Sequence, residues 1–241
     1  MERFEAALEA GLRQLEQREG IGRLKEHGLH AVLKFYFQPD AAYHEVKTGN
    51  YVADCVADDR IVEIQTGRFY AMRGKLLALL ADFAVTVVYP IQRRRRLIWI
   101  NPETGERSPG RLSPKIGRFS DALPELYWVA DAFDNPFFRL HLLLVDVDEH
   151  KLLNGYGIYK KLRATRVDRL PTAVGDELII EGRAGLAALL PELAQPFTKK
   201  DFEKATGLKG RNGFNALKLL DTSHVVQRAG KKGNAILYEK V

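Results

Sequence analysis

The sequence lacks several features that mark exported, disulfide-bonded or membrane proteins. Cys55 is its single cysteine in 241 residues, which excludes an intrachain disulfide and a cysteine-rich zinc module. No apolar run reaches the length of a membrane span, and the N-terminus is charged rather than signal-like. Internal repeats and low-complexity tracts are missing as well. We therefore expect a cytoplasmic protein with no membrane partner.

The composition that remains is typical of a globular protein. Hydrophobic residues make up 46% of the chain and charged residues 28%, and the length suffices for one large domain or two smaller ones. The formal net charge of +6 favours a polyanionic partner. In residues 2–18, a stripe of Phe4, Leu8, Leu12 and Leu15 predicts an amphipathic helix, used either for packing or for a homodimer.

The most informative stretch is 51–66, which reads as two short strands joined by a polar turn. Asp54 lies inside the first predicted strand and Glu63 inside the second, although a buried carboxylate is costly without a partner. Side chains alternate along a strand, so Gln65 shares the face of Glu63, and Asp54 joins them if the strands are neighbours. Such oxygen ligands suit Mg²⁺. The alternative is two surface acids beside a hairpin turn.

A helix predicted over 22–37 precedes these strands. Glu26, His30 and Lys34 recur at every fourth position and so form one polar ridge. That ridge is either a solvated face or one wall of the acidic site. A strand expected over 43–47 adds a third acid, Glu45.

This order of motifs resembles the PD-(D/E)XK nuclease superfamily, and more narrowly its competence protein CoiA-like branch, over about residues 22–100. The resemblance rests on a helix bearing Glu, His and Lys, then a strand Glu, a strand Asp and the motif Glu63-Ile64-Gln65. It implies an α/β fold: a mixed sheet flanked by helices, with a core of α-β-β-β-α-β order. It also implies a nuclease that requires Mg²⁺ or Mn²⁺.

The resemblance also implies roles for individual residues. Asp54 and Glu63 would hold the metal ion with the carbonyl of Ile64. The remaining catalytic positions would be Glu26, His30, Lys34, Glu45 and Gln65. Ala53 stands where the superfamily's name motif has proline, and Gln65 stands where it has its usual lysine. Lys34 is our candidate for the missing positive charge.

The middle of the chain predicts a crossover unit followed by basic segments. A helix over 69–82, with Arg68, Arg73 and Lys75 outward, leads into a central strand over 85–91. Four arginines follow, as either a solvated turn or a phosphate-contacting rim: Arg93, Arg94, Arg95 and Arg96. Further expectations are a strand over 97–101, a helix over 119–134, a strand over 139–148 and a basic hairpin or loop over 151–170. Asp146 and Asp148 end that last strand, as a structural end or a second acidic pair.

The last part of the chain predicts a second domain, 171–241, after a nuclease-like domain over 1–170. A linker over 171–176 would lead to a leucine-rich helix over 183–194, a helix capped by Thr198, a helix over 211–220 and a basic β-hairpin. This order resembles a winged helix-turn-helix. Phe214, Leu217 and Leu220 would face inward. The predicted nucleic-acid contacts are Arg211, Asn212, Asn215 and Lys218 on the helix and Lys231 and Lys232 in the wing.

The sequence thus predicts a metal-dependent nuclease that binds DNA through its C-terminal domain. Two other classes stay open: a catalytically inactive, nuclease-like protein that binds or regulates DNA, and an assembly protein whose winged helix binds another protein.

Overall fold

The computed structural model describes residues 2–18, 28–155 and 164–241. The first part of the fold is helical at its start and then forms three short strands and a helix. Its elements are α1 (Glu2–Arg18), α2 (Gly28–Phe37), η1 (Ala41–Tyr43), β1 (His44–Thr48), β2 (Tyr51–Ala57), β3 (Arg60–Ile64) and α3 (Phe69–Leu79). With β4 (Val85–Ile100) next, the run from α2 onward is helix, three strands, helix, strand, the order that the sequence predicted.

Two long strands and a group of short elements complete the chain. They are β5 (Arg111–Leu112), η2 (Phe119–Ala122), α4 (Leu123–Leu126), η3 (Tyr127–Asp134), β6 (Phe138–Leu152), β7 (Thr165–Ile180), η4 (Ala184–Leu189), β8 (Phe197–Thr198), α5 (Lys199–Thr206), α6 (Arg211–Thr222), β9 (Val226–Lys232) and β10 (Ala235–Lys240). None of the helices in the described ranges is long and apolar enough to cross a membrane.

A mixed sheet organises the α/β fold, as predicted. Its strand order is β1-β2-β3-β4-β6-β7, with β5 paired to β4. The pairs β3–β4 and β4–β6 are parallel and the other pairs are antiparallel. Strand β4 is central, and Val85, Val87 and Val88 on it are buried, as expected for a strand covered on both faces.

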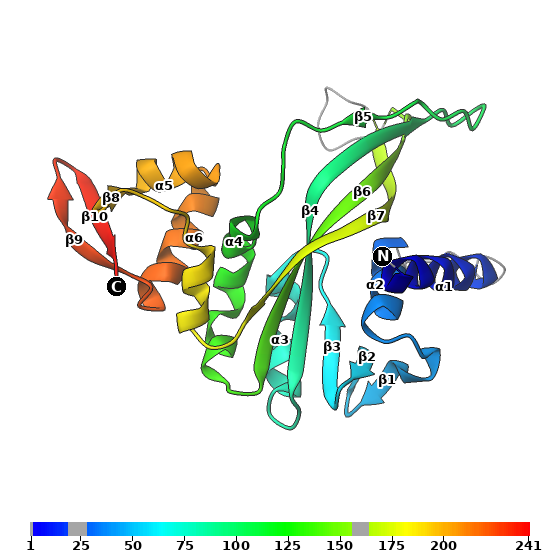
Figure 1. Cartoon of the computed structure of the whole chain (residues 1–241), viewed down its shortest axis with the longest axis horizontal. Helices are drawn as coiled ribbons and strands as arrows, with labels where there is room; N and C mark the ends of the chain where they lie inside the picture. The colour runs from blue at the N-terminus through cyan, green and yellow to red at the C-terminus, as the bar shows by residue number, and fades with distance from the viewer. Residues whose placement is uncertain (1, 19–27, 156–163) are drawn as a thin grey trace.

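Helices cover the two faces of this sheet (Figure 1). Helices α1 and α2 pack on one face, and α3 with the α4 region packs on the other. Helix α1 lies so close to α2 that a side chain at Gly11 would meet the backbone of Val32. Part of the α1 stripe, Phe4 and Leu8, therefore packs within the chain. A homodimer through α1 stays a prediction.

The four arginines do not form a turn, so the solvated-turn alternative is wrong, and the phosphate-contacting rim stays a prediction. Strand β4 runs without a break through Arg93–Arg96. A bulge falls between Gln92 and Arg94, and the neighbouring strand β6 then places Asp146 opposite Arg94 and Asp148 opposite Arg96. Opposite charges on facing strands stabilise such a pairing, which a single segment of sequence does not reveal. The two aspartates are therefore partners of the arginines and not a second acidic pair.

The predicted linker over 171–176 is also wrong, because β7 passes through it and pairs with β6. The domain boundary predicted after residue 170 would fall inside that strand. The basic segment 151–170 begins as the end of β6 and ends as the start of β7, and its residues 156–163 lie outside the described ranges.

Two predicted helices are broken or short. The segment 119–134 consists of α4 with a 3-10 helix on each side of it, and Val129 in the second of these has a non-helical backbone. The leucine-rich segment forms only η4. By contrast, Thr198 caps α5 as predicted: its side chain accepts a hydrogen bond from the Asp201 N–H.

Candidate active site

The two predicted acids lie where β2 and β3 separate. The antiparallel pairing of these strands runs from Ala57↔Arg60 to Cys55↔Val62, and the same register would put Asp54 opposite Glu63. Here the Oδ2 of Asp54 accepts a hydrogen bond from the N–H of Ile64 at 2.7 Å. The Asp54 side chain thus takes the place of a backbone acceptor at the end of the ladder. This hydrogen bond holds the Asp54 carboxylate between the two strands.

His30 of α2 holds the same carboxylate from the other side. Its Nε2 lies 3.2 Å from the Oδ2 of Asp54. Burial acts to raise the pKa of Asp54, but the hydrogen bond and charge of His30, the Ile64 N–H and the charge of Lys75 outweigh burial, so this pKa lies below its usual value. Asp54 is therefore an ionised carboxylate at neutral pH.

Glu63 is held by Lys75, which was predicted to point outward. The Nζ of Lys75 on α3 donates to the Oε2 of Glu63 at 2.6 Å and to the carbonyl of Val52 at 2.7 Å. Glu63 is only 5% exposed, and its Oε1 has no hydrogen-bond partner among the described residues. Burial, followed by the charge of Asp54, raises the pKa of Glu63 to about 7, against the opposing effect of Lys75.

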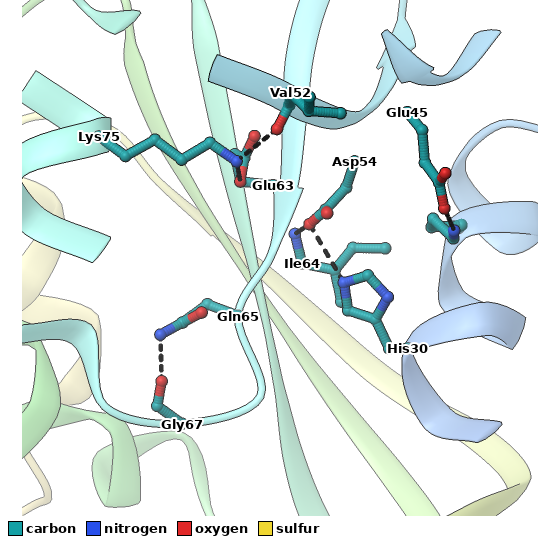
Figure 2. A network of polar contacts seen from close by, with 10 residues as sticks. His30, Glu45, Val52, Asp54, Glu63, Ile64, Gln65, Gly67 and Lys75 are labelled. Carbon is teal, nitrogen blue, oxygen red and sulfur yellow. Dashed lines mark hydrogen bonds and ion pairs between the residues drawn. The ribbon is translucent and has the colours of Figure 1, made fainter. Parts of the chain in front are cut away.

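These contacts bring four side chains together, and we call His30, Asp54, Glu63 and Lys75 the acid–lysine site (Figure 2). The charge of Asp54 raises the pKa of Glu63, and the charge of Lys75 lowers the pKa of Asp54, so the acids and the lysine act on one another. Two strands supply the acids, and a helix on each side supplies the partner. Lys75 could have been found from the crossover, because a helix that follows a strand returns over the sheet beside it.

The other predicted catalytic residues lie in different places. Lys34, a buried residue, pairs with Glu45 of β1 at 3.1 Å. The amide nitrogen of Gln65 donates to the carbonyls of Gly67 and Arg68, so it does not converge on the acids as predicted (Figure 2). Arg68 has a left-handed backbone, with φ of 43°, and Gln65 supports this turn into α3. Glu26 lies outside the described residues.

The donor set at the acid–lysine site suits a hard divalent cation. Mg²⁺ binds proteins through one or two carboxylates and keeps several waters for its remaining positions. Asp54 and Glu63 offer two carboxylates, and the unpartnered Oε1 of Glu63 is an oxygen that such an ion would satisfy. Within the ranges that the structure describes, there is no group of three or more His, Cys, Asp or Glu side chains placed to hold a metal. The described residues therefore fit a metal ion that is held by one or two carboxylates and completes its coordination with water.

The four arginines of β4 have different surroundings. Arg93 forms an ion pair with Asp146 at 2.7 Å, and the Nε of Arg96 donates to Asp148 at 2.8 Å. Arg95 lies 3.5 Å from Glu149. Arg94 lines a shallow cavity with Arg96 and the two aspartates.

On α6 the predicted contacts are only partly exposed. Arg211 and Asn212 are exposed, and so are Lys231 and Lys232 on β9. Asn215 is buried, which makes its prediction as a nucleic-acid contact wrong. Phe214 was expected in the core but is 56% exposed. Leu217 and Leu220 are buried as predicted, so the error is confined to Phe214, whose expected place in the core is taken by the next residue, Asn215.

Comparison with other sequences places the chain in a protein family. The chain is an α/β protein in which two acids, a histidine and a lysine cluster where β2 and β3 separate. Residues 27–181 match the family described as Domain of unknown function (DUF8091), and the chain belongs to this family. The chain is also 33% identical over 228 residues to an uncharacterized protein of Treponema pallidum (strain Nichols), covering 91% of this chain and 87% of that protein. No solved structure matches the chain.

The raised pKa of Glu63 predicts how stability depends on pH. The folded protein binds the Glu63 proton more tightly than the unfolded chain, with a pKa of about 7 against 4.5, so the resulting stability is complete below pH 4.5 and is lost as the pH rises to 7. Glu63→Gln has no carboxyl proton, so its stability does not fall in this way as the pH rises. From pH 4.5 to 7.5, the free energy of unfolding of Glu63→Gln should therefore rise by roughly 3 kcal/mol relative to wild type, measured by urea unfolding. Asp58→Asn, at an exposed turn, is the control; parallel curves for wild type and Glu63→Gln would contradict the prediction.

Proposed function

We propose that this protein is a nuclease that hydrolyses phosphodiester bonds of nucleic acid, DNA in particular, with Mg²⁺ or Mn²⁺ at the acid–lysine site. One observation carries the proposal: Glu63 is a buried carboxylate with a raised pKa, beside the ionised Asp54, and its Oε1 has no hydrogen-bond partner in the part of the chain that the structure describes. Perturbed acids grouped in this way are typical of functional sites, since a structural role needs neither the second acid nor the unpartnered oxygen.

The order of elements supports a PD-(D/E)XK-type core. Helix α2, strands β1 to β3, helix α3 and strand β4 follow the α-β-β-β-α-β order implied by the resemblance, and the two acids lie on the second and third of these strands. The match includes the parallel pairing of β3 with β4, which requires the crossover through α3.

Each residue of the site has a role in this proposal. Asp54 and Glu63, with the Ile64 carbonyl, would hold the metal ion, and His30 keeps the Asp54 carboxylate oriented. The bound ion would lower the pKa of a water molecule and stabilise charge on the phosphate. Lys75 provides the cation that the sequence lacks at Gln65, in preference to Lys34, which pairs with Glu45. The Lys75 ammonium, which contacts Glu63, could instead contact a phosphate oxygen or orient the attacking water.

The C-terminal elements support a winged-helix module for binding DNA. Strand β8, helices α5 and α6, and the hairpin β9–β10 follow one another, and β10 pairs with both β8 and β9. One face of α6 points away from the core and carries Arg211, Phe214 and Lys218, which lie three and four positions apart. The cations suit phosphates, and the exposed Phe214 suits contact with a base or sugar.

A catalytically inactive, nuclease-like protein that binds or regulates DNA is the second candidate. The observation that favours it is the ion pair between Lys75 and Glu63, which neutralises one of the two acids without a metal. The two candidates differ in the outcome of the cleavage test that follows.

Removing either acid should abolish cleavage. Asp54→Asn and Glu63→Gln keep the shapes of the side chains but remove the charges that would hold the metal, so we expect at least about a hundredfold loss of single-turnover rate on plasmid and single-stranded DNA with Mn²⁺. Asp58→Asn, an exposed acid in the turn of the same hairpin, should retain wild-type rate. Wild-type protein that never cleaves would favour the second candidate, and cleavage that survives both changes would place the chemistry elsewhere.

Lys75 should matter for chemistry more than for DNA binding. Lys75→Met removes the cation next to Glu63, so the cleavage rate should fall by about tenfold or more while affinity for uncleaved DNA changes little. Arg73→Met, on the same helix but paired with Asp131, is the matched control. A full rate in Lys75→Met, combined with a loss in Lys34→Met, would return the role to Lys34.

The exposed face of α6 should contact duplex phosphates. Lys218→Gln should weaken duplex binding and reduce the slope of log affinity against log salt by about 0.9, the value for one phosphate contact. Lys47→Gln, an exposed lysine on β1 at the other end of the sheet, controls for net charge. Equal slopes in wild type and Lys218→Gln would remove α6 from the interface.

A further inference from the structure

Glu149 on β6 is a buried carboxylate with three cations around it. Its Oε2 lies 3.5 Å from Arg95 of β4 and 3.3 Å from the Nε of Arg169 of β7, and its Oε1 lies 3.1 Å from Lys151. Glu149 is 3% exposed. One carboxylate cannot neutralise three cations, so the cluster keeps an excess of positive charge at fixed positions in the sheet.

A second contact fixes the Arg169 guanidinium. In the amide orientation that the neighbouring donors require, the side-chain oxygen of Gln92 accepts from the Nη1 of Arg169 at 2.9 Å and from its Nε at 3.0 Å. Arg169 is thus positioned by two acceptors from two strands before any ligand arrives. Such preorganisation reduces the entropy lost when an anion binds.

Two cavities, of about 370 and 280 Å³, meet at Arg169 and Thr66, which line both of them, and together we call them the basic cleft. Among the residues that the structure describes, five cations line the cleft and two acids oppose them: Arg68, Arg95, Lys115, Arg166 and Arg169, against Asp121 and Asp168. Asp121 pairs with Lys115 at 3.3 Å, and Asp168 accepts the backbone N–H groups of Gly28 and Arg169. The described part of the lining therefore has a net positive charge.

The basic cleft borders the acid–lysine site. Thr66 and Gly67 line it and belong to the connection from β3, which carries Glu63, to α3, which carries Lys75. Leu29, the neighbour of His30 on α2, lines it as well. An extended anion in the cleft would therefore continue past the β3–α3 connection toward the two acids.

We propose that the basic cleft binds the phosphodiester backbone of the nucleic-acid strand next to the phosphate that is cleaved, with Arg95, Lys115 and Arg169 as the phosphate contacts. This assignment rests on the proposed nuclease function. A network that only joined three strands would need balanced charges, whereas this one has more cations than acids and opens into a cleft.

Neighbouring arginines of β4 provide a matched comparison. Side chains alternate along a strand, so Arg95 lines the basic cleft, whereas Arg96 lines the separate cavity with Asp148. Arg96 is more exposed than Arg95 and would be the better contact if exposure alone decided binding.

The test measures binding without cleavage. A labelled single-stranded DNA of about twelve nucleotides is titrated in EDTA over a salt series, with fluorescence anisotropy as the readout. We expect Lys115→Gln and Arg169→Gln each to weaken binding by about tenfold and to lower the salt slope by about 0.7. Arg96→Gln should bind within about twofold of wild type. Lys115 is an exposed loop residue whose replacement leaves the Glu149 network intact, so its result does not depend on the folding of Arg169→Gln.

The outcomes separate this assignment from the function on which it rests. Loss of binding in Lys115→Gln but not in Arg96→Gln supports the basic cleft even if wild-type protein cleaves nothing. Equal affinity and slope in wild type and Lys115→Gln would overturn it even if the protein cleaves DNA. Displacement of the oligonucleotide by micromolar inorganic pyrophosphate would also overturn it, because the ligand would then be a small phosphate and not a strand.

Discussion

The site depends on one physical constraint: Glu63 is a carboxylate buried at the point where two strands of a sheet separate. A buried charge needs a partner or a proton, and this one uses both, through Lys75 and a pKa raised to about 7. The partner comes from α3, and the neighbouring acid Asp54 takes its own partner from α2. The helices on the two faces of the sheet are thus linked to the acids as well as to the apolar core.

The same pairing principle extends along the sheet to its long strands. Arg93 and Arg96 on β4 are matched by Asp146 and Asp148 on β6, which lets a run of arginines continue as a strand. Farther along, Glu149 is outnumbered by the cations around it. The sheet is therefore close to charge balance on the aspartate side of β4 and positive in the basic cleft, so position on one strand decides which arginines are available to a ligand.

Local patterns predicted the parts of the fold that depend on local physics. The hairpin carrying Asp54 and Glu63, the helix before it, the buried strand after α3 and the Thr198 cap all follow from alternation, turn residues and capping over a few positions. What failed depends on distant partners. The solvated-turn alternative for the arginine run failed because Asp146 and Asp148 lie about fifty positions away. Lys75 was placed outward because its acceptor lies on another element. On α6, Phe214 and Asn215 were exchanged because an amphipathic stripe fixes the buried face only to within one position.

The proton on Glu63 bears on how a polyanion and two carboxylates can share one site. With both acids ionised and unpaired, the site would repel a phosphate. The raised pKa keeps Glu63 partly protonated near neutral pH, and Lys75 offsets the charge that remains, so the metal-free site presents little net negative charge beside Asp54. A divalent cation that binds there must displace the Glu63 proton, which makes its affinity rise with pH. In the proposed nuclease, the backbone of a strand would therefore approach along the basic cleft first, and the acids would take up their full charge only when a cation arrives to balance it.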